Sequence, residues 1–507
     1  MLPWSVLGEP DLTAGSPAEN TALLLSLVSA GPPAPAIRPF GSAERRELLR
    51  AVLGHRRPEQ DLPSTAVSWN AWADLEWNSS WPVPIRDGPV WRGRGVTGIT
   101  GGGLTYSRGF LDVAIRPIAF WSQNQGFDPP VPRPPDDYRD PFWGHLIDRP
   151  YRFGGHDYSR IDPGESWVRL ESHRVALAFS TAGQHWGPAQ YFPLLMGTEA
   201  GGYPRVSMQL RSLRTPLGTA TAEWSVGRLE ASPFALEPPG SRSRVMPSLV
   251  ASFVPAGMSG LEVGGARLFH VRWRAPAIGI KTALLPFKGL LKTGDPTGEQ
   301  VSGDQNQIGT IFLKVAPPGK GIAVYGEYYR EDHNVDVRDL VAEPDHQSGY
   351  TLGVRRVFEH GPSVAALTVE VMNSRISHLE RVRGQAPLST HGTIREGHTL
   401  RGQPLGSWAI AGGGGAAVVY ERIDAASGMS IEGWMLRSTQ NLEGGTWNGQ
   451  FLNVYSLRLT RTALERIGGV FRWTVHVDYK PRMKQALNLG IGLSTTLGAD
   501  RLVRSRP

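Results

Sequence analysis

The sequence predicts an all-β fold, and its composition and length favour a single large antiparallel β-barrel. The chain of 507 residues contains Gly 61 and Pro 41 with 40% hydrophobic residues, which suits many strands and turns. At this length several compact cores would be usual, and one large barrel is the main exception. No apolar run approaches the roughly 20 residues that a transmembrane helix needs. A barrel is therefore the only way in which this chain could span a membrane.

Residues 1–64 differ from the rest and are predicted to form a linker and a helical segment. The sequence Pro-Pro-Ala-Pro at 32–35 is a stiff linker. After it, residues 42–53 have apolar side chains at helical spacing, and Ser42 can cap the helix. The apolar run 21–30 resembles the core of a short signal peptide. However, acidic residues rather than Lys or Arg precede it, so an export signal is not evident.

From about residue 65 apolar residues recur at every second position, which gives each predicted strand one apolar and one polar face. This is what a sheet between lipid and a watery lumen requires, although a soluble β-sandwich would show the same alternation. Roughly 430 residues, at about 22–26 for each strand with its connection, give about 16–20 strands. The barrel is predicted over residues 65–498, with a last strand at 485–497 and a tail at 499–507. Clear examples of apolar alternation are Phe269, Val271 and Trp273; Trp473, Val475, Val477 and Tyr479; and Leu487, Leu489, Ile491 and Leu493.

Two irregular stretches, residues 127–150 and 374–403, are predicted to be long loops. The first contains too many prolines for a continuous strand, and the second is polar and rich in Arg and His. Loops at the outer end of a membrane barrel are where it would meet an external polymer.

Two sequence blocks occur in order and at a characteristic distance. The first is His185, Trp186, Gly187 and Pro188, followed by an apolar step at 194–196 and a Gly/Pro turn at 201–204. The second runs from Asn306 and Gln307 through Tyr325, Gly326 and Glu327 to Glu331 and Asp332. Together they resemble the signature of the capsule assembly protein Wzi family. The resemblance implies an outer-membrane barrel of 18 strands with a periplasmic helical element before it.

The resemblance also implies a function and a location. The protein is expected to bind capsular or other surface polysaccharide and to help attach it to the cell, without catalysis. Its expected location is the outer membrane of a Gram-negative-type bacterium, so membrane lipid is a second partner. The block residues are expected to be mainly structural, with Trp186 packing at a corner and Pro188 ending a ladder. Aromatic rings stack on sugars and Arg suits carboxylates, which makes four loop residues the candidates for sugar contact: Tyr138, Arg139, Trp143 and His145.

Charge and motif content exclude other classes of function. The net charge of +7 and the absence of a Lys/Arg cluster allow an acidic polysaccharide but predict no nucleic-acid partner. Cysteine is absent, and neither a nucleophile elbow nor a zinc-protease motif occurs. Glu327 and Glu331 could share a face, and we expect them to line the lumen paired with Arg side chains such as Arg330. No catalytic residue, metal or cofactor is predicted.

One alternative from a different class of function stays open at this point. A passive outer-membrane channel for small solutes should have an open, smoothly lined lumen, whereas a binder should have a lumen crowded with charged groups and covered by the helix at 42–53. A barrel enzyme would need a nucleophile and a base near the rim, and the sequence shows no such pair.

Overall fold

The computed structural model describes residues 14, 16–38, 65–172, 174–239, 242–273, 279–288, 305–331, 344–361, 363–376, 386–424, 427–439, 451–464 and 469–502. The helix predicted at 42–53 and the block residue Asp332 lie outside the described residues.

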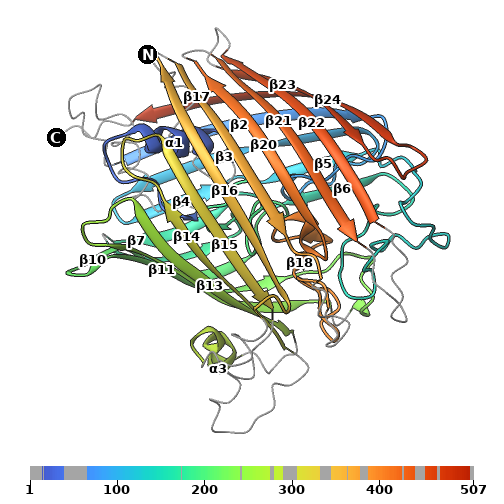
Figure 1. Ribbon diagram of the computed structural model, residues 1–507, viewed down its shortest axis with the longest axis horizontal. Helices are drawn as coiled ribbons and strands as arrows, with labels where there is room; N and C mark the ends of the chain where they lie inside the picture. The colour runs from blue at the N-terminus through green and yellow to red at the C-terminus, as the bar shows by residue number, and fades with distance from the viewer. Residues whose placement is uncertain are drawn as a thin grey trace.

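The described residues form a closed antiparallel barrel of 18 strands, as the sequence predicted (Figure 1). Twenty strand segments make up these strands, because β4 and β5 are two halves of one strand and β6 and β7 are two halves of the next. The segments are β2 Thr65–Asn78, β3 Gly95–Arg108, β4 Leu111–Ile115, β5 Ile118–Ser122, β6 Tyr158–Asp162, β7 Trp167–Glu171, β8 Val175–Ser180, β10 Arg205–Thr215, β11 Gly218–Leu229, β12 Arg244–Pro255, β13 Leu261–Arg272, β14 Gln305–Val315, β15 Ile322–Glu331, β16 Ser348–His360, β17 Ser363–Asn373, β20 Gly414–Ile423, β21 Ser427–Thr439, β22 Phe451–Leu464, β23 Val470–Tyr479 and β24 Leu487–Leu502.

Pairing of the last strand with the first closes the barrel. β24 and β2 pair from Asn78 with Gly490 to Ala66 with Leu502. The predicted end of this strand at Leu497 is therefore wrong. The polar residues that follow Leu497 broke the apolar alternation, but their backbone groups still have a partner on β2.

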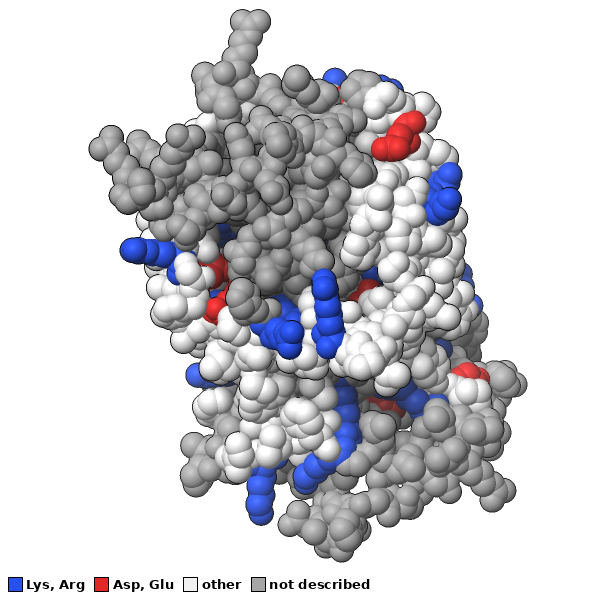
Figure 2. Space-filling view, turned by 90° about the vertical axis from the view of Figure 1, so that its left-hand side faces the viewer, with Lys and Arg blue, Asp and Glu red and all other residues white. Residues whose placement is uncertain are grey.

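The strands alternate between an apolar outer face and a lumen face. On β16, Leu352 and Val354 are 53% and 44% exposed on the outside, while Thr351 and Arg355 are buried inside. Figure 2 shows one side of this wall, on which acidic side chains are few and Lys and Arg are more prominent. Among the described helices, none is long and apolar enough to cross a membrane.

The two ends of the barrel differ in their connections. Tight turns join β10 to β11, β12 to β13 and β14 to β15 at the end of the barrel where β2 begins and β24 ends (Figure 1). The opposite end carries the long connections, among them residues 123–157, 181–204 and 374–413. In bacterial outer-membrane barrels the short turns face the periplasm and the long loops face outward.

Much of the long connections folds into the lumen instead of standing above it. Residues 181–204 are almost all buried, and so is most of 394–412. The largest apolar cluster among the described residues combines side chains from these segments with lumen-facing side chains of the wall; it includes Trp81, Trp143, Trp186, Leu194, Leu195 and Trp408. The core of the molecule is thus a plug inside the barrel, made of residues 181–204 and 386–413 and supported by residues 79–94.

The N-terminal helix also packs inside the barrel, at the short-turn end. Helix α1 (Pro17–Val28) begins at Ser16, whose hydroxyl accepts a hydrogen bond from the Glu19 N–H. Its leucines at 23–25 and 27 are buried against Ala323, Tyr325 and Val357 of the wall. The apolar run that resembled the core of a signal peptide is therefore explained by burial of this helix.

Candidate functional site

The first sequence block turns the chain into the lumen. β8 is six residues long, and the chain then leaves the wall and forms strand β9 (His185–Trp186), which pairs with β1 (Ile37–Arg38). Trp186 is buried, and its backbone N–H donates to the Met196 carbonyl at 3.1 Å. Gly187 has φ 102°, and a Cβ at this position would overlap a carboxylate oxygen of Glu327. Only glycine allows so close an approach to the wall.

Two carboxylates from the wall hold this segment by its backbone. Glu327 on β15 accepts hydrogen bonds from the N–H groups of Ala189 at 2.9 Å and Leu194 at 3.1 Å. Glu370 on β17 accepts three more, from the N–H groups of residues 190, 191 and 192 at 2.7–3.0 Å. The Tyr325 hydroxyl also donates to Glu370, at 2.6 Å. The two sequence blocks therefore meet, and we call this contact the Glu327/Glu370 clamp.

The clamp corrects one expectation. Glu327 was expected to pair with an Arg side chain, but its hydrogen bonds go to backbone N–H groups of the plug. A buried carboxylate needs several strong donors, and five N–H groups from one tight segment supply them to Glu327 and Glu370. The neighbouring Gly326 lies on the outer side of β15, against Leu352.

The rest of the second block holds residues 386–413. The Asn306 side-chain amide donates to Glu331 at 2.9 Å, and the other Glu331 oxygen accepts from the Ser389 N–H at 2.6 Å. The Tyr329 and Ser389 hydroxyls lie 3.1 Å apart. Gln307 points to the outer side of the wall, where its amide oxygen accepts a hydrogen bond from Arg267 at 2.7 Å.

Two buried histidines, His270 and His398, link the wall to both segments of the plug. Nε2 of His270, on β13, lies 2.8 Å from Nδ1 of His398, and Nε2 of His398 lies 2.6 Å from the Leu195 carbonyl. Because the Leu195 carbonyl can only accept, Nε2 of His398 donates to it, and a neutral His398 then accepts at Nδ1 from Nε2 of His270. Burial lowers the pKa of His398 to about 4, which keeps it neutral.

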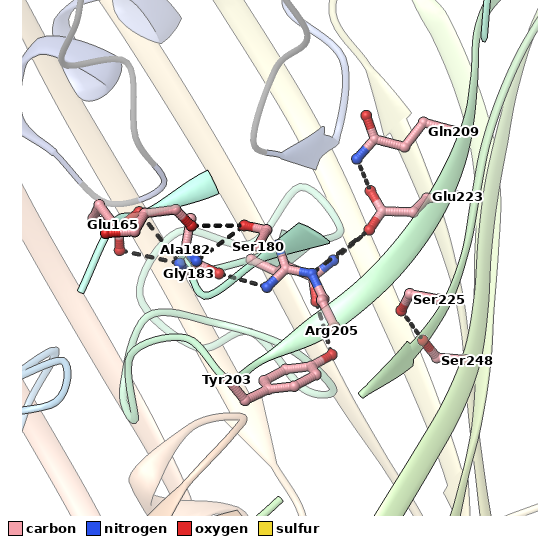
Figure 3. A network of polar contacts seen from close by, with 12 residues as sticks. Glu165, Ser180, Ala182, Gly183, Tyr203, Arg205, Gln209, Glu223, Ser225 and Ser248 are labelled. Carbon is pink, nitrogen blue, oxygen red and sulfur yellow. Dashed lines mark hydrogen bonds and ion pairs between the residues drawn. The ribbon is translucent and has the colours of Figure 1, made fainter. Parts of the chain in front are cut away.

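Further carboxylates, which the sequence did not single out, fix the start of the plug and the N-terminal segment. Glu165 accepts from the Gly183 N–H at 3.0 Å, and Arg205 donates to the Ala182 carbonyl at 2.6 Å (Figure 3). Glu223 accepts from the amide groups of Gln184 and Gln209 at 2.7 and 2.9 Å. The only signal for such residues in the sequence was their place on the polar face of an alternating strand or in a turn.

The N-terminal segment is fastened in the same way. Glu262 on β13 accepts from the Ala36 N–H at 3.0 Å. It also pairs with Lys314 at 2.7 Å, and the same ammonium donates to the Ala34 carbonyl. Residues of the wall thus hold three separate inward segments by their backbone groups.

A polar cavity of about 550 Å³ lies between the plug and the wall formed by β20–β24 and β2. Its lining includes residues next to the short turns, such as Gly428 and Ala463, so it lies toward the periplasmic end. Charged side chains of both signs face it, among them Asp74, Glu76, Arg92, Arg458 and Arg472. In the described part of the chain, no three His, Asp or Glu side chains are grouped to hold a metal ion.

The four residues expected to contact sugar do not all lie at the surface. His145 is exposed, and Tyr138 and Arg139 are half-buried. Trp143 is fully buried against the plug, which corrects its expected role in direct contact. The reason is local: the Asp140 carboxylate accepts from the N–H groups of Phe142 and Trp143, and the turn that results directs the indole inward.

The fold and the inward plug define a closed, plugged β-barrel, an architecture typical of outer-membrane proteins. No protein-family model matches the chain, and no curated protein matches it in sequence. The chain is similar in structure to Wzi of Escherichia coli, described as an outer-membrane protein involved in group 1 capsule assembly and a carbohydrate-binding β-barrel. The TM-score is 0.59 at 12% identity, covering 94% of this chain and 96% of that one. The resemblance noted in the sequence therefore holds for the fold.

Two structures from Pseudomonas aeruginosa are similar to a lesser degree. OccK2 in complex with glucuronate has a TM-score of 0.44 at 9% identity, over 86% of this chain and 96% of that one. OprD has a TM-score of 0.43 at 10% identity, over 87% of this chain and 95% of that one.

Proposed function

We propose that this protein binds capsular or other surface polysaccharide at the outward end of its barrel and helps attach it to the cell, without catalysis. The observation that carries the proposal is the fastened plug. Residues 181–204 and 386–413 lie inside the barrel, and carboxylates of the wall hold both by backbone N–H groups. Such a plug gives the outward end a fixed base for binding. The fold similarity to Wzi, which is described as carbohydrate-binding, supports the same function.

The loop 123–157 offers the contacts for sugar in this proposal. Tyr138 presents a half-buried ring, with the Arg152 guanidinium 6.0 Å from its centre, and His145 is exposed nearby in sequence. Arg139 is 35% exposed and pairs with Asp137 at 2.8 Å, which orients its guanidinium. Rings beside guanidinium groups suit sugars that carry carboxylates. The net charge of +7 favours an acidic polysaccharide.

A passive channel is the second candidate, and the cavity of about 550 Å³ beneath the plug favours it. Solutes could fill this space from the periplasmic end. Passage through the barrel would then require residues 181–204 to leave the clamp.

Deletion of the protein in its native host tests the proposal. Cell-attached and shed surface polysaccharide are quantified, and we expect material to move to the shed fraction while total synthesis is unchanged. Complementation with a Tyr138→Ala, Arg139→Ala and His145→Ala triple variant should restore attachment only partly. A Met258→Ala and Lys320→Ala variant, altered at exposed positions of short turns, serves as the control and should restore it fully. An unchanged distribution in the deletion strain would overturn the proposal.

A further inference from the structure

A short segment of the β13–β14 connection lies against the outer face of the wall. It comprises residues 279–288, with helix α3 (Ile280–Ala283) and the 3-10 turn η4 (Leu285–Phe287), and we call it the outer segment. The turn contacts β12 and β13. Trp224, which points outward from β11, donates its indole N–H to the Ala283 carbonyl at 2.9 Å. The rings of Trp224 and Phe287 are 6.4 Å apart.

Arg267, a charged residue of the wall, holds the outer segment against the outer face of the barrel by hydrogen bonds. Arg267 is in the middle of β13, and its neighbours Ala266 and Leu268 belong to the core inside the barrel, so its side chain faces outward. It is nevertheless only 8% exposed. Its guanidinium donates to the carbonyl of Pro286 at 3.3 Å, to that of Lys288, and to Gln307. A charged side chain that faces lipid without partners is costly. The carbonyl groups of the outer segment supply partners for this guanidinium, so the outer segment lies on the membrane-facing surface.

The exposed side chains of the outer segment are apolar or basic. Ile280, Leu284 and Phe287 are 70%, 44% and 57% exposed. Lys281 and Lys288 are exposed as well, and residues 279–288 include no acidic residue. Apolar side chains on one element with lysines at its ends are typical of segments that lie in a membrane interface.

We infer that the outer segment binds a lipid with a phosphorylated headgroup in the outer leaflet. Ile280, Leu284 and Phe287 enter the acyl chains, and the ammonium groups of Lys281 and Lys288 reach the headgroup phosphates. Two observations select lipid over a glycan or a protein: the exposed surface is apolar between the lysines, and Trp224 and Arg267 hold the segment on the lipid-facing side of the wall. The positive charge selects an anionic headgroup.

The depth of the outer segment can be measured on the full chain, because its lack of cysteine allows single labels. An Ile280→Cys variant carries a nitroxide, and its accessibility to oxygen and to a water-soluble nickel complex is measured in nanodiscs of zwitterionic phospholipid. Ile311→Cys, on the outward face of β14, is the lipid reference, and His145→Cys is the water reference. We expect the Ile280 label to match the Ile311 label. Accessibility like that of the His145 label would overturn the inference.

The headgroup is tested with the two lysines. The affinity of the wild type for a fluorescent phosphorylated lipid is compared with that of a Lys281→Gln and Lys288→Gln variant. About 1 kcal/mol for each lysine near a charged surface corresponds to about a fivefold loss of affinity per lysine. Lys320→Gln, at a short turn, should change nothing. Retained affinity in the double variant would overturn the headgroup contact. So would full competition by inorganic phosphate, because it would show that a free anion and not a lipid is bound.

Discussion

The two inward segments of the plug differ in how their contacts with the wall are distributed. Residues 181–204 are fastened by the Glu327/Glu370 clamp, in which two carboxylates accept five backbone N–H groups. Residues 386–413 are fastened by single contacts: Glu331 with Ser389, the His270–His398 pair, and the Arg244 guanidinium, which donates to the carbonyls of Gly397 and Thr399.

This difference should make residues 181–204 the more firmly held segment and residues 386–413 the segment that changes in conditions can loosen. The clamp concentrates several charge-assisted hydrogen bonds on one tight stretch of chain, so the loss of one carboxylate leaves many groups unsatisfied at once. The contacts of 386–413 are spread over the segment, and one of them depends on a neutral histidine. We expect 181–204 to stay in place under conditions that loosen 386–413.

The largest effect is expected from Glu370→Ala. It leaves three backbone N–H groups and the Tyr325 hydroxyl buried without their acceptor, which should cost about 3 kcal/mol or more of stability. Thermal unfolding of the purified barrel in detergent measures the loss. Glu359→Ala, at the exposed end of β16, is the control and should unfold like the wild type. Equal stability of both variants would mean that the clamp does not hold the plug.

A Gly187→Ala substitution should be the next most severe. The added Cβ would overlap Glu327 at a positive φ, and we expect a loss of about 2 kcal/mol. Gly392→Ala places the same methyl group in the other segment, where no atom lies within 4 Å, and should be nearly neutral. The pair of variants is compared by thermal unfolding and by protease cleavage within 181–204. Similar behaviour of the two would contradict the close approach.

Glu331→Gln tests the second segment and should have a smaller effect. The Ser389 N–H loses an ionised acceptor but can keep a neutral one, which costs about 1–1.5 kcal/mol. Limited proteolysis should show faster cleavage within 386–413, while 181–204 stays protected. Faster cleavage of both segments together would show that they move as one unit.

The smallest expected effect is a dependence of the stability of the folded barrel on pH. The pKa of His398 is about 4 in the folded barrel against 6.5 for the free side chain, so the folded state binds fewer protons between these values. Its contribution is complete above pH 6.5 and decreases as the pH falls toward 4, by about 1 kcal/mol at pH 5.5. Burial of Glu199 acts in the opposite direction, because it raises the pKa of that carboxyl to about 8 and favours the folded state at lower pH.

The difference between wild type and His398→Gln isolates the histidine from these other groups. Protease cleavage within 386–413 is measured from pH 7.5 to 5. The wild-type segment should become more accessible in acid, and the glutamine variant should show a weaker trend. A trend of equal steepness in both proteins would remove His398 from the explanation.

Strand periodicity predicted the wall of the barrel well. A strand between lipid and lumen must alternate, and β13, β23 and β24 show this plainly in sequence. The last strand was underestimated because Ala499–Leu502 pair through their backbone without apolar alternation.

The plug could not be predicted in the same way. Its apolar residues, such as Leu194 and Leu405, lie in irregular stretches where no period separates buried from exposed positions. The second half of the clamp, Glu370, is a polar residue on the lumen face of a strand, and only its contacts distinguish it from any other lumen-facing residue. The family resemblance marked both Gly187 and Glu327 as block residues, but the sequence did not show that they lie in contact.

Ion conductance in planar bilayers tests the central claim most directly. The purified wild-type barrel is inserted at symmetric salt and neutral pH, beside the Glu370→Ala variant. The account predicts no sustained open level for the wild type, because the clamped plug closes the lumen, and open levels for the variant. A stable open channel formed by the wild type would contradict the account and would favour the passive channel.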